Sequence, residues 1–235
     1  MKNYLSHLQS IGDNEVNFQR KIGYIKYNFG KYIKELNSKS TVLEIGPGSG
    51  AVECYLNSNS VTNIDLIDND LPVLKYVQNK YTVNKVFQTS DLSKIKSKLQ
   101  KYDLIFMLQV FEHIPRDQYV SLINVLVGQL KKDGKIIIMV PNGGNPLGLL
   151  ERYHDLQHEN AYTTDSLYEL TNYCGVSGVS SLVEGYKIPP YNIINLIRII
   201  LQKILHLLII MALIVNGGVY QTIMTPNITL IISKK

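Results

Sequence analysis

Three alternate glycines and an acid near the start of the chain have the spacing of a ligand-binding turn. Gly46, Gly48 and Gly50 follow a short apolar run, and Glu44 lies two residues ahead of the first of them. Glycines between a strand and a helix let backbone amides approach a ligand beyond the end of the strand. The later glycine of a dinucleotide fingerprint is absent, so a turn needed only for packing is the alternative interpretation.

An acid further along the chain is placed where it could hold a sugar ring. Asp68 follows Gly50 by 18 positions and ends the second apolar run. A carboxylate at this distance can accept hydrogen bonds from both hydroxyls of a ribose. Asp68 could instead cap the helix that follows, and Asp65 is a less favoured substitute.

Short apolar runs alternate with longer polar segments, which predicts βαβ units and a parallel sheet. Strand-length runs lie at 41–46, 61–68, 102–110 and 134–140, with a weaker one at 85–91. We predict helices over 117–134, ending at the Asp133–Gly134 turn, and over 163–175, and two final strands over 179–188 and 227–235.

The remaining segments define the domain organisation that we expect. Apolar residues at helical spacing over 14–36 predict an N-terminal helical cap, residues 1–40. The main domain then covers residues 41–235. Within it we expect an acceptor loop at 141–165, rich in Gly, Pro, Asn and His, and a helical insertion at 189–217.

Composition limits the class of protein. The chain has 235 residues, 45% hydrophobic and 18% charged, which suits one globular domain. Its net charge of +5 is scattered, which is weak support for nucleic acid and better support for an anionic surface. Cys54 and Cys174 lack metal or redox spacing. The N-terminus has no apolar core of signal-peptide length, so we expect a cytoplasmic protein.

Four motifs in chain order resemble the motif series of class I S-adenosylmethionine-dependent methyltransferases. They are the stretch 42–50, Asp68, the stretch 90–92 and the stretch 102–115. The resemblance is close from about Thr41 to Asn142. It implies a Rossmann-like, seven-stranded α/β sheet with helices on both faces, an antiparallel last strand, and the cofactor across the carboxyl ends of the first strands.

The same resemblance implies which residues hold S-adenosylmethionine. The methionine moiety would contact Glu44 and the three glycines, and the ribose would contact Asp68, with Asn69 beside it. Asp91 and Leu92 would contact the adenine, and Gln109 would lie near the sulfonium.

The pair Glu112–His113 resembles the Glu-His pair of ubiquinone-type O-methyltransferases, in which a further upstream acid helps to hold a metal. That upstream position is Gln109 here, so we expect no metal. His113 is a candidate catalytic residue. The alternative is an imidazole that bonds to nearby backbone.

Residues 151–167 follow the expected fifth strand and resemble the R-Y-x-D-x-x-H pattern of methyltransferases of bacterial surface-polysaccharide and O-antigen biosynthesis. His158 is our candidate general base, because an imidazole titrates close to working pH. Asp155 could orient it. Arg152, Tyr153 and His154 could contact an anionic or polyhydroxylated acceptor. The alternative is a polar network that only shapes the loop.

The apolar stretch 192–215 contains Arg198, Lys203 and His206, which disfavours a simple membrane span. Its polar residues recur every three or four positions, which predicts an amphipathic helix on a surface. That surface is the membrane interface, a partner's identical helix or this protein's own core. We predict reversible association with anionic bilayers through Pro190–Val215.

We therefore expect O-methylation of a sugar, glycan or related small molecule in surface-polysaccharide biosynthesis, either free in the cytoplasm or at the inner face of the membrane. The alternatives are methylation of a quinone or lipid precursor and a non-catalytic cofactor-binding subunit. A nucleic-acid acceptor is disfavoured, because the chain has no dense basic stripe and no Pro-Cys or Asn-Pro-Pro-Tyr signature after the fourth strand.

Overall fold

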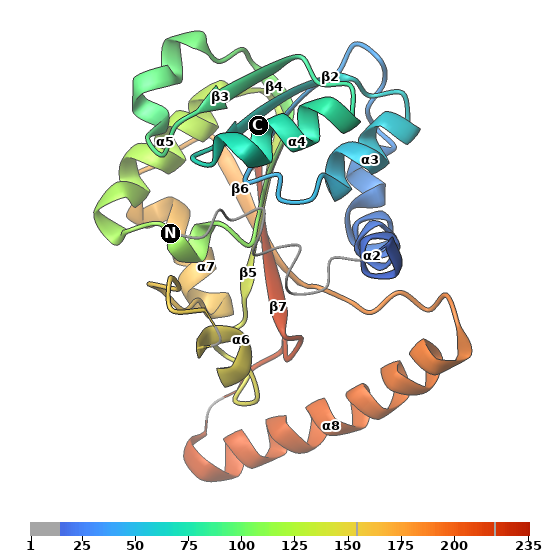
Figure 1. The fold of residues 1–235 in the computed structure, drawn as a ribbon. Helices are drawn as coiled ribbons and strands as arrows, with labels where there is room; N and C mark the ends of the chain where they lie inside the picture. The colour runs from blue at the N-terminus through green and yellow to red at the C-terminus, as the bar shows by residue number, and fades with distance from the viewer. Residues whose placement is uncertain (1–14, 154, 219) are drawn as a thin grey trace.

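The computed structural model describes residues 15–153, 155–218 and 220–235. A twisted seven-stranded sheet forms its centre, in the order β3-β2-β1-β4-β5-β7-β6 (Figure 1). The strands are β1 (Thr41–Ile45), β2 (Asn63–Asp68), β3 (Lys85–Gln88), β4 (Tyr102–Leu108), β5 (Leu130–Pro141), β6 (Val179–Gly185) and β7 (Asn227–Lys234). Strand β7 runs antiparallel to both of its neighbours, as expected, and the other pairs are parallel.

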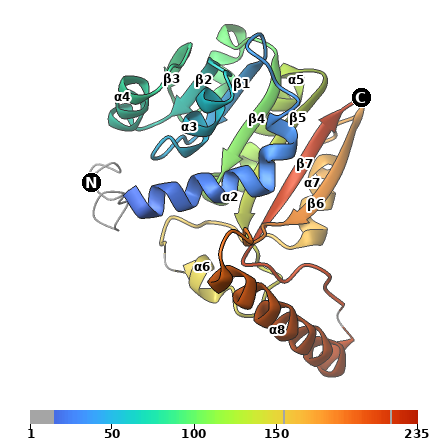
Figure 2. The ribbon, with the colours of Figure 1, turned by 90° about the vertical axis from the view of Figure 1, so that its right-hand side faces the viewer.

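Helices cover both faces of the sheet (Figure 2). One face carries α2 (Glu15–Ile33), α3 (Ala51–Ser58) and α4 (Leu71–Lys80), and the other carries α5 (Tyr119–Gln129), α7 (Thr164–Tyr173) and the 3-10 helix η1 (Leu92–Lys98). Two short 3-10 helices, η2 (Phe111–His113) and η3 (Arg116–Gln118), follow β4. The helix expected over 14–36 is observed as α2, whose Phe18, Ile25 and Phe29 join the core.

The prediction of a helix that extends to Asp133 is wrong at the carboxyl end. Helix α5 ends at Gln129, and β5 begins at Leu130, which pairs with Tyr102 of β4 and is fully buried. Asp133 takes a positive φ of 62° where the pairing register shifts. Pairing and burial of Leu130 outweigh the local helix signal, because intrinsic propensity is the weaker term.

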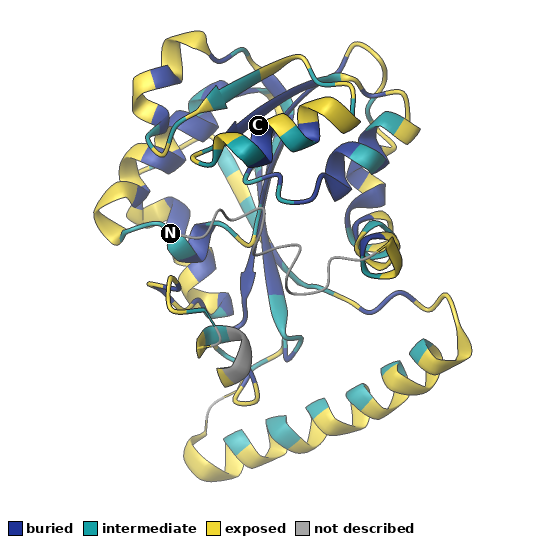
Figure 3. Cartoon of the chain, in the orientation of Figure 1, coloured by how far each residue is buried: buried dark blue, intermediate teal, exposed yellow. Residues whose placement is uncertain are grey.

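Helix α8 (Ile193–Gly217) lies apart from the rest of the molecule, beyond the carboxyl ends of the parallel strands (Figures 1 and 2). It connects β6 to β7, and Gly185 at the end of β6 pairs with Ile228 near the start of β7. Both ends of α8 are therefore tethered to the same sheet edge. None of its residues is buried (Figure 3), so the structure does not place it in the protein's own core.

Candidate active site

An open cleft of about 1890 Å³ lies at the carboxyl ends of β1, β2 and β4. It is lined by almost all of the predicted cofactor residues, namely Glu44, Gly46, Gly48, Asp68, Asn69, Asp91, Leu92 and Gln109. Gly50 is the exception and forms the N-cap of α3. Helix α2 adds Arg20, Lys21 and Tyr24 to the cleft wall, which the sequence motifs did not indicate.

The three glycines of the first turn have different reasons to be glycine. A Cβ on Gly46 would lie 2.4 Å from a methyl group of Val110, and one on Gly50 would lie 2.5 Å from the Tyr81 ring. A Cβ on Gly48 would meet nothing within 4 Å. All three have positive φ, which glycine adopts without strain. Packing thus explains Gly46 and Gly50, whereas Gly48 leaves the turn open toward the cleft.

The two acids of β2 have separate environments. Asp65 is fully buried and accepts hydrogen bonds from the Tyr102 hydroxyl at 2.8 Å and the Asn84 amide at 2.9 Å. Asp68 lines the cleft, and burial raises the pKa of its carboxyl group. The N-cap of α4 is Asp70, whose backbone N–H donates to Asp68 Oδ1 at 2.8 Å. Asp68 is therefore the acid of this strand that faces a ligand.

Two other predicted cofactor residues, Asp91 and Gln109, are held by hydrogen bonds to other residues. Asp91 accepts from the Ser93 hydroxyl at 2.6 Å and from the Ser93 N–H at 3.0 Å, and these bonds lower the pKa of its carboxyl group. Gln109 has a φ of 57° and donates from Nε2 to Asn227 Oδ1 at 3.0 Å. The Gln109 bond links the cleft to the first residue of β7.

A second buried acid lies behind the first turn. Glu44 is 2% exposed and its Oε2 has no hydrogen-bond partner among the described residues. Burial, together with the charge of Glu53, raises the pKa of Glu44 well above its usual value. Glu53 is also fully buried, and the sequence signal for it was an acid inside the apolar start of a helix.

These groups fit S-adenosylmethionine. The unpartnered Glu44 oxygen suits an ammonium group, Asp68 suits ribose hydroxyls, and the cleft is larger than a typical ligand pocket. Which moiety each residue contacts stays a prediction.

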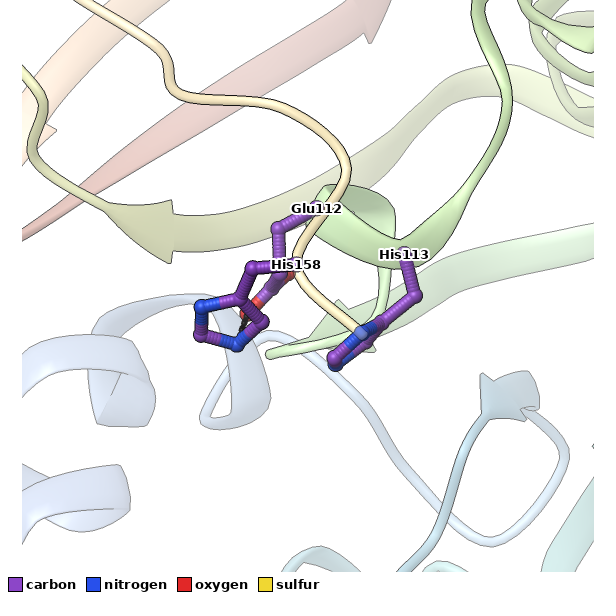
Figure 4. Close-up of side chains that lie close together, drawn as sticks. All are labelled: Glu112, His113 and His158. Carbon is purple, nitrogen blue, oxygen red and sulfur yellow. Dashed lines mark ion pairs between the residues drawn. The ribbon is translucent and has the colours of Figure 1, made fainter. Parts of the chain in front are cut away.

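Beside the cleft, η2 brings Glu112 and His113 against the loop that contains His158. The backbone N–H groups of Glu159 and Asn160 both donate to Glu112 O, at 3.0 and 3.2 Å, which fixes this loop on η2. His158 Nε2 lies 4.0 Å from Glu112 Oε1 (Figure 4). His113 lines the cleft, with its Nδ1 at 3.1 Å from the Gln157 carbonyl.

The predicted acceptor residues divide between loop support and cleft lining. Arg152, next to the end of α6 (Leu149–Tyr153), donates to the carbonyl of His158 at 2.6 Å, which favours the network alternative for Arg152. Tyr153 is exposed, and His154 lies outside the described residues. Asp155 lines the cleft and accepts from the Gln157 N–H at 2.8 Å. The carboxylate beside His158 Nε2 belongs to Glu112.

A family model described as "Methyltransferase domain" matches residues 18–176, more than half of the chain. The chain belongs to this methyltransferase domain family. Together with the sheet order and the cleft, this match makes the protein an S-adenosylmethionine-dependent methyltransferase, with S-adenosylmethionine as its cofactor.

Solved methyltransferase structures share the fold. A SAM-dependent methyltransferase from Archaeoglobus fulgidus superposes with a TM-score of 0.64 over 100% of both chains, at 20% identity. The plantazolicin methyltransferase BpumL, in complex with SAH, gives a TM-score of 0.63 at 16% identity, over 98% of this chain and 90% of its own. These likenesses support the Rossmann-like methyltransferase fold.

One curated relative matches a shorter stretch. Ribosomal RNA small subunit methyltransferase A of Prochlorococcus marinus (strain MIT 9515) is 25% identical over 107 residues, which are 43% of this chain and 36% of that protein. The match spans about a third of the relative's length. The ribosomal RNA in the relative's name is therefore a substrate of that protein and is not transferred to this chain.

Proposed function

We propose that this methyltransferase modifies a hydroxyl group of a lipid-carried glycan precursor at the inner face of the membrane, as in surface-polysaccharide biosynthesis. The observation that carries the proposal is the position of α8, an exposed apolar helix at the same sheet edge as the cleft. Bound S-adenosylmethionine supplies a methyl group that its sulfonium already activates. The chain must then hold the acceptor in line and accept its proton.

The acceptor side of the cleft has polar groups suited to hydroxyls. His113, Asp155 and Gln157 line it, and all three lie on or beside the segment 151–167 or the η2 helix that holds it. His158 remains our candidate base. Its Nδ1 lies 3.2 Å from the Arg152 carbonyl, so the nitrogen beside Glu112 is the one that would accept a proton. The Arg152 carbonyl rather than Asp155 then orients the ring.

The outer surface of α8 is strongly apolar. Among the described residues, α8 is the one helix long and apolar enough to cross a membrane, with a mean hydropathy of 2.2 over its most apolar window. Ile200, Leu207 and Leu208 are at least 54% exposed and do not line the pocket between α8 and the body. Asn195, Gln202 and His206 are half-buried on the side that faces the body. These polar residues share their half-buried side with Ile199, Ile209 and Leu213, and Arg198 is exposed, so the helix is apolar on most of its surface.

The connections of α8 decide how it can contact a bilayer. The helix has 25 residues and is about 37 Å long. If it crossed the bilayer, residues 218–226 would have to return through the hydrocarbon to β7 as extended chain. Backbone without internal hydrogen bonds is not tolerated there. We therefore infer that α8 lies in the plane of the interface, with its apolar face in the lipid.

This orientation brings the cleft close to the membrane surface. Pro141 at the end of β5 pairs with Asn227, so the connection that leaves α8 reaches the sheet beside the strand that leads into the acceptor loop. The net charge of +5 favours anionic lipid headgroups. A lipid-carried acceptor would present its sugar at the membrane surface, close to the cleft. A free small molecule would not need the enzyme to be held at the membrane.

Co-sedimentation with vesicles tests the membrane contact. We expect the protein to pellet with phosphatidylglycerol/phosphatidylcholine vesicles at low salt and to pellet less at high salt, because screening removes only the electrostatic part of binding. The double variant Ile204→Glu/Leu208→Glu places charges on the apolar face and should stay in the supernatant.

The control is Val16→Glu, which places one carboxylate on an exposed apolar position of α2 and should pellet like the wild type. No pelleting at low salt, together with a dimer in analytical ultracentrifugation that the double variant abolishes, would assign α8 to a subunit interface instead.

Transfer of label tests the acceptor. The purified enzyme is incubated with methyl-labelled S-adenosylmethionine and a lipid extract of the cells that make it. We expect label in the organic phase that mild acid releases as a methylated sugar. Label that appears only on RNA, peptide or quinone would refute the glycan acceptor.

A further inference from the structure

The side chains of Glu112, His113 and His158 lie close together (Figure 4), and His113 lines the cleft while the other two are buried behind it. One potential ligand atom from each lies within 4.8 Å of the other two. Glu112 and His113 come from η2, and His158 comes from the loop pinned to it. We propose that these three residues bind a divalent transition-metal ion.

Glu112 is the first argument for a cation. Its side chain is fully buried, and neither carboxylate oxygen has a hydrogen-bond partner among the described residues. Burying a carboxylate is unfavourable unless a cation or hydrogen bonds compensate for the lost water. The 4.0 Å between Glu112 Oε1 and His158 Nε2 is too long for a hydrogen bond, so the imidazole alone does not provide this compensation.

The histidine orientations are the second argument. His113 Nδ1 lies 3.1 Å from the Gln157 carbonyl, and His158 Nδ1 lies 3.2 Å from the Arg152 carbonyl. A carbonyl can only accept, so each Nδ1 carries the proton and each Nε2 carries the lone pair. Histidines that bind metals are held in this way, with the other ring nitrogen donating to a backbone carbonyl or a carboxylate.

The ligand set indicates the class of ion. Two imidazoles and one carboxylate suit Zn²⁺, Fe²⁺ or Co²⁺ and leave coordination positions for water or substrate. An ion with ligands at about 2 Å in tetrahedral geometry holds them about 3.3 Å apart, so ligand atoms that lie within 4.8 Å of one another need to close by up to about 1.5 Å. His113 lines the cleft, so the open positions face the acceptor.

This site deepens the proposed function and rests on it for its role, and with an ion bound His158 Nε2 is a ligand instead of the base. A metal ion at this wall would bind the acceptor hydroxyl and make its proton easier to remove. It also revises the expectation of no metal drawn from Gln109, since Gln109 Nε2 donates to Asn227 and the third ligand comes from His158.

The test measures metal binding alone, without methyl donor or acceptor, so it is independent of whether the proposed acceptor is right. Untagged protein is stripped with a chelator and titrated with Co²⁺, followed by visible absorption, and with Zn²⁺, followed by calorimetry. We expect one ion per chain and absorption bands typical of imidazole ligation. Glu112→Gln, His113→Ala and His158→Ala should each weaken binding at least ten-fold.

His206→Ala on α8 is the matched control and should bind as the wild type does. A wild-type protein that binds neither ion overturns the proposal, as does unchanged affinity in the three variants or an equal loss in the control. If a variant does not fold by circular dichroism, the wild-type titration decides by itself.

Discussion

The cleft and α8 depart from ordinary burial in opposite directions. In the cleft, the carboxylates of Glu44 and Glu112 are withdrawn from water without enough partners. Along α8, isoleucines and leucines such as Ile194 and Ile200 are exposed to it. Both arrangements are unfavourable in the isolated chain. Each implies a partner of complementary chemistry: cationic and polar ligands in the cleft, and an apolar medium beneath α8.

The rest of the molecule follows the usual rules and supplies the stability. The strands are lined on both faces by buried apolar side chains, which form one cluster with α5 and α7 and another with α2, α3 and α4. Substitutions can therefore separate the two unusual regions from the fold that carries them.

The largest effect is expected on the cleft side of the comparison, at His158. Whether it acts as base or as metal ligand, His158→Ala should reduce turnover by about 10²- to 10⁴-fold. Binding of S-adenosylhomocysteine should stay intact, because His158 is not one of the residues that line the cleft. Label transfer and calorimetry measure the two quantities. Parallel losses of turnover and thermal stability would instead support a purely structural loop network.

Two leucine-to-alanine substitutions, one in the core and one on α8, compare how much each region contributes to the free energy of unfolding. Leu56 of α3 is fully buried, and Leu56→Ala should lower the free energy of unfolding by about 2–5 kcal/mol. Leu208 of α8 is 54% exposed, and Leu208→Ala should change it by less than about 0.5 kcal/mol. Urea denaturation of both variants gives the comparison. If Leu208→Ala lowered the free energy of unfolding by more than about 1 kcal/mol, Leu208 would be packed against other residues in solution.

Asp68 tests whether the cleft holds the cofactor as inferred. Asp68→Ala removes the charged acceptor for the ribose hydroxyls, and we expect S-adenosylhomocysteine to bind about 1.5–3 kcal/mol more weakly by calorimetry. Asp117→Ala, at a carboxylate that lines the same cleft on η3, is the control and should retain its affinity. Unchanged affinity in a folded Asp68→Ala protein would remove Asp68 from the binding site.

The smallest effect concerns the buried acids Glu44 and Glu53. Burial raises the pKa of both, so above the unfolded value of 4.5 the folded state binds more protons and stability falls as pH rises. Glu53→Gln removes one group, and the slope of the unfolding free energy against pH should lessen by no more than about 1.4 kcal/mol per pH unit. Thermal unfolding from pH 5 to 8 measures it. An unchanged slope would show that Glu53 is not titrating in this range.

The sequence alone predicted those features that depend on interactions within one or two neighbouring helices or strands. The strand runs at 41–46 and 61–68 are confirmed, because period and strand ends are local properties. The glycine turn and Asp68 lie at the ends of these strands, and the role of Asp68 stays a prediction. The end of α5 was misplaced, since the pairing of Leu130 with Tyr102 joins segments that the local pattern treats separately.

Only the tertiary structure decided which side chains meet and which stay uncovered. The sequence paired His158 with Asp155, its near neighbour, whereas the fold brings His158 to Glu112, a residue 46 positions away. The pattern of 192–215 predicted a helix on a surface, but not that the helix would lie apart from the core with none of its residues buried. The pairing of Gly185 with Ile228 attaches both ends of the helix to one sheet edge, and such a pairing of distant segments is not readable from local sequence.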